Sequence, residues 1–190
     1  NNEPTEAIQY LKKAIKIKPN STSILSMIGD ACNSTGHYKL AISYYKTILK
    51  INSQDATTHY NMGNALQAEG SIRAAIESYS NALIIKPSYA EAYTNMGIAL
   101  KDNGDVTAAI KSHKKSIRID PNCAESYYNL GNALNKDHDL NAAIMSYKKA
   151  IKIMPEHSDA YNNMGVAFHN AREFDAAITH FKQALKIKPN

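Results

Sequence analysis

An eight-residue segment returns every 34 residues and restricts this chain to one kind of fold. Its clearest copy is Tyr127–Leu134, and every copy carries a glycine in the same place. The recurring glycines are Gly29, Gly63, Gly97, Gly131 and Gly165. A fixed period of this length indicates a repeat array, in which each unit buries its apolar face against its neighbours. We therefore expect the 190 residues to form one quasi-linear domain.

Apolar residues at helical spacing predict two helices in each unit. The first helices are expected over 21–34, 55–68, 89–102, 123–136 and 157–170. The second helices are expected over 38–51, 72–85, 106–119, 140–153 and 174–187. An amphipathic helix over Pro4–Ile17 precedes them and is interpreted as the second helix of a unit whose first helix is absent.

The turn inside each helix pair calls for a residue with positive φ, which glycine adopts without steric cost. Gly36, Gly70 and Gly104 occupy this place in the first three pairs. His138 and Arg172 occupy it in the last two pairs, where we expect slightly strained turns.

A residue pattern accompanies the period. The fourth unit carries it as Tyr127, Leu130, Gly131, Leu134, Ala143, Tyr147 and Pro155. The fifth unit carries it as Tyr161, Met164, Gly165, Phe168, Ala177, Phe181 and Pro189. The pattern resembles the tetratricopeptide repeat over essentially the whole chain. The resemblance implies an all-α fold, a right-handed superhelical solenoid of antiparallel helix pairs. It divides the single solenoid domain 1–190 into a half repeat, 1–20, and five full repeats, 21–54, 55–88, 89–122, 123–156 and 157–190.

Departures from the pattern are local. His59 and His113 stand at aromatic core places, and we expect both to be structural histidines with satisfied ring nitrogens. Alanine at Ala143 and glycine at Gly131 should allow the two helix backbones of a pair to approach closely. A bulky residue at either place is expected to overpack the pair.

The sequence contains no recognisable catalytic constellation. The seven histidines do not form a cluster, and none lies at helical metal-ligand spacing from another histidine or a cysteine. Neither a glycine-rich phosphate loop nor a nucleophile elbow is present. We predict no catalytic residues, no metal site and no cofactor in these 190 residues.

Basic residues give the chain a formal net charge of +5, and most of them fall on the second helices. The resemblance places those helices on the convex wall, where lysines stabilise helix ends and remain solvated. Aromatic residues that could stack on bases do not alternate with them. We therefore disfavour nucleic acid and membrane as partners. An RNA- or membrane-binding convex face stays a further hypothesis, testable by reversing Lys114, Lys115, Lys148 and Lys149.

The resemblance also implies that the first helices line a concave groove. One asparagine recurs there with the period, two residues before each glycine: Asn61, Asn95, Asn129 and Asn163. Asparagine offers both a donor and an acceptor, so this asparagine ladder could match the main chain of an extended peptide. The predicted peptide-binding surface also includes Asn64, Asn132, Tyr60, Tyr128, Glu91 and Glu125. Thr94 is expected on the same inner wall.

Two interpretations of the ladder remain open. Asparagine could simply suit an exposed helix of a generic repeat. A comparable ladder is found in the repeat superhelix of O-linked N-acetylglucosamine transferases, so the chain could be the substrate-recruiting region of a larger transferase whose catalytic domain lies outside it. A chaperone-tail adaptor is disfavoured, because Glu91, Glu125 and Asp159 should repel an acidic tail. We therefore predict a non-catalytic scaffold that binds a peptide or helix of a partner protein in this groove.

The ends lack the polar capping helices that solenoids need. We expect a piece of a longer protein, with Ala7, Leu11 and Ala14 partly bare and the uncapped repeat ends able to self-associate. Cys32 and Cys123 lie in different repeats and are expected to be reduced, which favours a cytoplasmic location.

Overall fold

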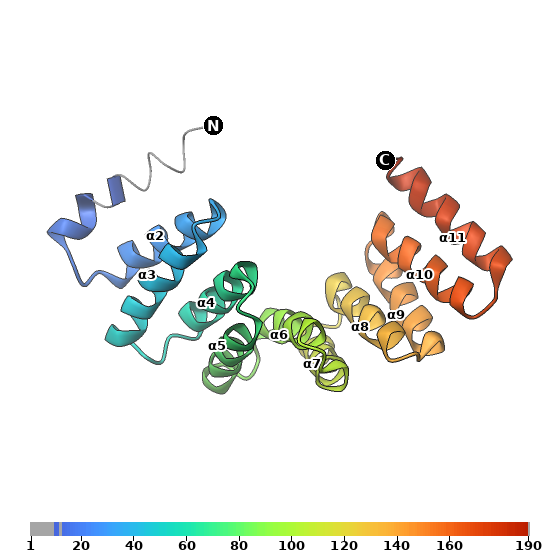
Figure 1. Ribbon diagram of the computed structural model, residues 1–190, viewed down its shortest axis with the longest axis horizontal. Helices are drawn as coiled ribbons and strands as arrows, with labels where there is room; N and C mark the ends of the chain where they lie inside the picture. Colours follow the sequence, from blue (N-terminus) through green and yellow to red (C-terminus); the bar gives the residue numbers. More distant parts are fainter. Residues whose placement is uncertain (1–9, 12, 190) are drawn as a thin grey trace. The chain divides into compact units, whose positions relative to one another are not determined.

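The computed structural model describes residues 10–11 and 13–189 (Figure 1). Within these residues every regular element is a helix. The labelled helices are α2 (Thr22–Ser34), α3 (Tyr38–Ile51), α4 (Ala56–Glu69), α5 (Ile72–Ile85), α6 (Ala90–Asp102), α7 (Val106–Ile119), α8 (Ala124–Lys136), α9 (Leu140–Ile153), α10 (Ser158–Asn170) and α11 (Phe174–Ile187). The second helices have the predicted bounds, and each first helix begins one residue later than predicted. The predicted all-α solenoid of helix pairs is confirmed.

The expected opening helix falls partly outside the described residues. Residues 10–11 and 13–17 are helical, whereas Pro4 and Ala7 are not among the residues described. Leu11 and Ala14 are half-buried, in line with the expectation that this end is partly bare.

The chain divides into two compact units, Asn1–Ala92 (unit 1) and Tyr93–Asn190 (unit 2). In unit 1, α3 packs between α2 and α4, and α4 packs on α5. In unit 2, α8 packs on α7 and α9, and α10 packs on α9 and α11. First helices of consecutive pairs also touch, α2 on α4 and α8 on α10. The single domain over 1–190 stays a prediction.

A ring from the second helix packs directly on the recurring glycine of the first. A Cβ atom added to Gly131 would lie 2.5 Å from Cε1 of Tyr147, far inside van der Waals contact. Ala143, one turn before Tyr147 on α9, is fully buried. These contacts support the expectation that larger residues overpack the pair.

Side chains and turns set the helix ends. Asp105 and Asp139 accept hydrogen bonds from Ala108 N and Ala142 N at 3.1 Å, so both cap their helices. His138 and Arg172 have φ values of 62° and 64°, in the left-handed region that glycine adopts in the earlier pairs. Both residues therefore have the positive φ expected from their place in the turn, and the strain that a Cβ atom would cause there stays a prediction.

Candidate functional site

A hydrogen-bonded cluster joins three helices of unit 2 around one asparagine. The Oδ1 atom of Asn132, on α8, accepts a bond from the Tyr147 hydroxyl of α9 at 2.9 Å. The same oxygen accepts a second bond from Nδ2 of Asn163, on α10, also at 2.9 Å. Nδ2 of Asn163 further donates to the Tyr128 hydroxyl at 3.1 Å. The ladder asparagine Asn163 therefore fastens its own repeat to the preceding one.

Unit 1 contains the same arrangement with a carboxylate at its centre. Oδ1 of Asp30, on α2, accepts a bond from the Tyr45 hydroxyl at 2.7 Å and one from Nδ2 of Asn61 at 3.1 Å. Asp30 is not among the residues predicted from the sequence. Its signal was its register, because it directly follows a recurring glycine, as Asn132 does.

Both tyrosines of these clusters remain hydrogen-bond donors. Burial raises the pKa of Tyr45, and the bond to Asp30 raises it further. Burial likewise raises the pKa of Tyr147, with a smaller effect from neighbouring Tyr128. Because both rings are fully buried, each hydroxyl needs an acceptor, which the residue after the glycine supplies.

The third repeat lacks this cluster. Ile98 stands where Asn132 stands in the fourth repeat, and His113 replaces the tyrosine. Nδ2 of Asn129 turns within its own helix and donates to Oε1 of Glu125 at 2.8 Å. His113 is fully buried, and neither ring nitrogen has a hydrogen-bond partner among the described residues. The expectation that His113 is satisfied is wrong, because no polar side chain was placed opposite it. Burial, together with the charge of Lys101, lowers the pKa of His113 to about 4.

Three buried hydroxyls bridge α6, α7 and α8 instead. Thr94 Oγ1 lies 2.8 Å from Ser116 Oγ and 2.8 Å from Ser126 Oγ, and the two serines are 3.0 Å apart. Thr94 is therefore a buried residue and not part of an open inner wall, which corrects the sequence-based expectation. The small residue at this place leaves room for the hydroxyls, where the second and fourth repeats hold tyrosine.

Those tyrosines, Tyr60 and Tyr128, pack on the first residue of the next repeat. The Tyr60 ring centroid lies 4.9 Å from that of Tyr89 in unit 1. The Tyr128 centroid lies 4.7 Å from that of His157 in unit 2. Both tyrosines are half-buried, so part of each ring serves packing between repeats and part remains accessible.

The remaining predicted residues also lie on the first helices. In unit 1, Oδ1 of Asn64 accepts a bond from the Tyr79 hydroxyl at 2.8 Å, and Glu91 is exposed at the start of α6. In unit 2, Asn95 is half-buried on α6, and Glu125 is exposed on α8. Oε2 of Glu125 lies 3.8 Å from Nε2 of His157.

Within unit 2, the structure brings four predicted residues onto one surface of α8 and α10. We call this the α8–α10 surface; it consists of Glu125, Tyr128, Asn132 and Asn163. Asn129, predicted to lie on the same surface, is buried, which corrects the sequence-based expectation. Nδ2 of Asn132 makes no hydrogen bond with the described residues and is not a buried, unsatisfied atom, so it faces solvent. The surface therefore offers a free amide donor beside the Tyr128 hydroxyl and an exposed carboxylate.

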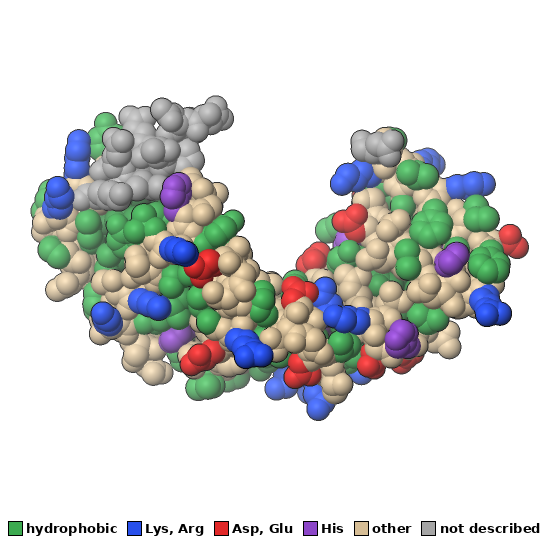
Figure 2. Space-filling view, in the orientation of Figure 1, with side chains coloured by type: hydrophobic (Ala, Val, Ile, Leu, Met, Phe, Trp, Pro, Cys, Tyr) green, Lys and Arg blue, Asp and Glu red, His purple; other side chains and the backbone are tan. Residues whose placement is uncertain are grey.

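On the face shown in Figure 2, Lys and Arg side chains are interspersed with Asp and Glu over both units. Among the residues described, no group of three or more His, Cys, Asp or Glu side chains is arranged to hold a metal ion. Nor does any helix in that part of the chain have the length and apolarity required to span a membrane.

The helix pairs, the glycine contacts and the polar first-helix surface define an α-helical repeat array. Family profiles agree with this class. The profile described as "TPR repeat" matches residues 29–70, 63–104 and 99–137, and profiles described as "Tetratricopeptide repeat" match 122–190 and 1–21. The chain belongs to the tetratricopeptide repeat family. A search of curated protein sequences found no match.

Solved structures resemble the chain closely in fold. The crystal structure of MamA is 30% identical, with a TM-score of 0.80 over 85% of this chain and 95% of MamA. The structure of YrrB, described as "a TPR protein with an unusual peptide-binding site", is 20% identical, with a TM-score of 0.76 over 95% of this chain and 93% of YrrB. The structure of pilF from Pseudomonas aeruginosa is 18% identical, with a TM-score of 0.83 over 100% of this chain and 86% of pilF. These similarities show that the chain has the fold of a tetratricopeptide repeat array.

Proposed function

We propose that this chain is a non-catalytic scaffold that binds an extended peptide segment of a partner protein along its first helices, in the concave groove predicted from the sequence. The free amide donor of Asn132 within the α8–α10 surface is the observation that carries the proposal. The peptide-binding site named for YrrB is consistent with it, at the level of a shared fold.

In this proposal the ladder asparagines contribute in different ways. The Asn163 amide donates to two groups of the preceding repeat and the Asn61 amide to one, so we assign these two side chains to positioning other groups. Asn163 holds Asn132 and Tyr128 in place. In the proposed complex, peptide carbonyls accept bonds from Asn132 Nδ2 and the Tyr128 hydroxyl, and a peptide N–H donates to Glu125. Fixing these groups in the free protein reduces the ordering cost on binding.

The test is a displayed random-peptide library selected against the chain and against Asn132→Asp. Aspartate keeps the oxygen that accepts from Tyr147 and Asn163, as Asp30 shows in unit 1, but removes the donor amide. We expect the selected peptides to lose about tenfold or more in affinity for Asn132→Asp, with unchanged circular dichroism.

Two control variants separate charge from hydrogen bonding. Asn141→Asp adds the same charge at an exposed place on α9 and should bind like the parent. Tyr128→Phe keeps the ring packed against His157 but removes the hydroxyl, and it should weaken the same peptides. Equal peptide binding by the parent, Asn132→Asp and Tyr128→Phe would refute the proposal and leave the ladder as a structural feature of the repeats.

In the alternative function the same surface binds the peptide, but the chain is one region of a larger enzyme. In it, the chain recruits substrates for a larger transferase of the O-linked N-acetylglucosamine type, to which the asparagine ladder bears a resemblance. The parent gene decides this alternative, because a glycosyltransferase domain encoded after residue 190 would support it and an unrelated region would exclude it.

Self-association through a repeat end is part of the proposal. Ile178 and Leu185, on α11, are 50% and 57% exposed, whereas the matching Ile144 on α9 is 6% exposed beneath α10. A second copy of the chain could cover this face, as α10 covers α9. Light scattering should show a mass above the monomer at high concentration, and Ile178→Glu should restore the monomer. A monomeric parent at every concentration would exclude it.

The cytoplasmic location also remains a proposal. Cys32 and Cys123 are both free thiols, which suits a reducing compartment. Fractionation of the source cells, with the parent protein detected by an antibody, is the direct test. Recovery in a secreted or extracellular fraction would contradict the proposal.

A further inference from the structure

An apolar pocket opens on unit 2 and is lined by none of the residues of the α8–α10 surface. Tyr127 and Leu130 of α8 and Met145 and Ser146 of α9 form it, with a volume of about 340 Å³. This lies at the small end of the range for ligand sites, roughly 300–1,000 Å³. The pocket therefore fits one or two side chains better than a large cofactor.

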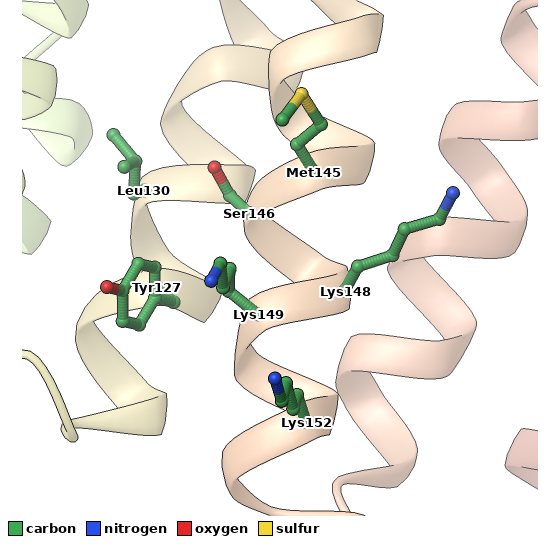
Figure 3. Close-up of a pocket in the computed structure, with 7 residues that line it drawn as sticks. All are labelled: Tyr127, Leu130, Met145, Ser146, Lys148, Lys149 and Lys152. Atoms are coloured by element: carbon green, nitrogen blue, oxygen red, sulfur yellow. The ribbon is translucent and has the colours of Figure 1, made fainter.

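Two of the three lysines that line this pocket lie at one side of it. Figure 3 shows Lys149 and Lys152 on the side of α9 that faces Tyr127, while Lys148 extends to the opposite side. Lys148 lies over the Phe168 ring, 5.8 Å from its centroid. Lys149 and Lys152 are exposed and make no ion pair or hydrogen bond with any residue that the structure describes.

Packing of the core does not require an apolar side chain at Met145. Its side chain is 69% exposed, so it contributes little to the core. The other four repeats all have a polar residue at the corresponding place: Ser43, Glu77, Lys111 and Thr179. The fold tolerates a polar residue there, and the exposed methionine is specific to the fourth repeat.

Met145, Lys149 and Lys152 form one stripe along α9, at spacings of four and three residues. The stripe is apolar at one end and cationic at the other, and α9 contains no Asp or Glu that could neutralise it. A partner of complementary chemistry presents an apolar side chain to the pocket and carboxylates to the two ammonium groups. An amphipathic helix does this with residues three or four apart.

We propose that the pocket and stripe of α8 and α9 bind a short acidic amphipathic helix of a partner protein. Its apolar anchor enters the pocket between Leu130 and Met145, and its carboxylates pair with Lys149 and Lys152. Nucleic acid fits this surface less well, because successive bases stack on several aromatic rings and half-buried Tyr127 is the one aromatic residue that lines the pocket. A lipid surface fits less well because the apolar lining is confined to one small pocket.

The test selects a displayed library of helical peptides of about sixteen residues, roughly four turns. Acidic residues are fixed four and seven positions after a randomised anchor. We expect apolar anchors to be enriched, and the selected peptides to lose about tenfold or more in affinity for Met145→Thr and for Lys149→Glu/Lys152→Glu. Threonine is chosen because Thr179 holds the same place in the fifth repeat.

Matched controls separate this site from charge in general and from the proposed groove. Lys182→Glu/Lys186→Glu reverses two exposed lysines of α11 and should leave binding unchanged. Asn132→Asp, which disables the proposed groove, should also leave it unchanged. No enrichment, or selected peptides that bind Met145→Thr as well as the parent, would overturn the proposal. Full displacement of the peptides by oligouridine or by phosphatidylserine vesicles would overturn it in favour of RNA or membrane.

Discussion

His113 should make the stability of this protein depend on pH in a predictable direction. Its imidazole is fully buried against Gly97 with both nitrogens unpaired, and its pKa falls from the ordinary 6.5 to about 4. Below about pH 6.5 the unfolded chain binds a proton at His113, whereas the folded chain does so only near pH 4. The stabilisation that neutral His113 contributes is therefore fully present above about pH 6.5 and is lost as the pH falls toward 4.

The size of the loss follows from the shift in pKa. A difference of about 2.5 units corresponds to roughly 3 kcal/mol, of which about 2 kcal/mol is already lost at pH 5. His113→Phe removes the titrating group, and Phe181 shows that phenylalanine suits this place when an aliphatic residue, Val166, stands opposite it. At neutral pH the variant should gain about 1–3 kcal/mol, because two buried unpaired nitrogens disappear.

The assay is urea unfolding followed by circular dichroism at pH 7.5 and at pH 5 for the parent and His113→Phe. Burial also lowers the pKa of His180, but that effect is common to both proteins and cancels in the difference. The advantage of His113→Phe should grow by about 2 kcal/mol between the two pH values. An advantage that is equal at both pH values, or absent, would refute the reasoning.

Three further substitutions test the packing. Gly131→Ala should lower the free energy of unfolding by about 1–2 kcal/mol, since overpacking against Tyr147 outweighs the better helix propensity of alanine. A variant that is more stable than the parent in thermal melts would show that the Tyr147 ring can move aside. Arg172→Gly should raise the free energy of unfolding, measured with urea, by about 1 kcal/mol, because glycine adopts the positive φ of this residue without strain. A lower free energy of unfolding would mean that the arginine side chain stabilises the turn. Tyr147→Phe should lower the free energy of unfolding by about 1 kcal/mol, because the hydrogen bond to Asn132 is lost, and it should speed amide hydrogen exchange in α8. Unchanged exchange would contradict a role for that bond.

Most of the fold could be predicted from periodicity alone. The 34-residue repeat placed all second helices correctly, and the residues between the helices of a pair predicted positive φ even at His138 and Arg172. These features follow from the spacing of residues along the chain, which a single sequence shows directly, and from the backbone conformation that a short turn requires.

The candidate site was predictable only in part, because its geometry depends on contacts between repeats. The period identified Asn163, but it could not show that the donor atoms of this side chain are used by Tyr128 and Asn132 of the preceding repeat. In the same way, an aromatic place occupied by His113 did not reveal that Ile98 stands where a hydrogen-bond acceptor was needed. Side-chain partners some thirty residues apart follow from helix packing and not from spacing.

The central claim is that Asn132 and Tyr128 offer free hydrogen-bonding groups to a peptide main chain. It is tested most directly by nuclear magnetic resonance of the side-chain amide of Asn132, assigned by comparison with Asn132→Asp, during titration with a selected peptide. We expect this amide signal to shift with the same affinity as the peptide itself, and the Asn141 amide not to move. Saturating peptide binding that leaves the Asn132 amide unmoved would place the peptide elsewhere and contradict the proposed function.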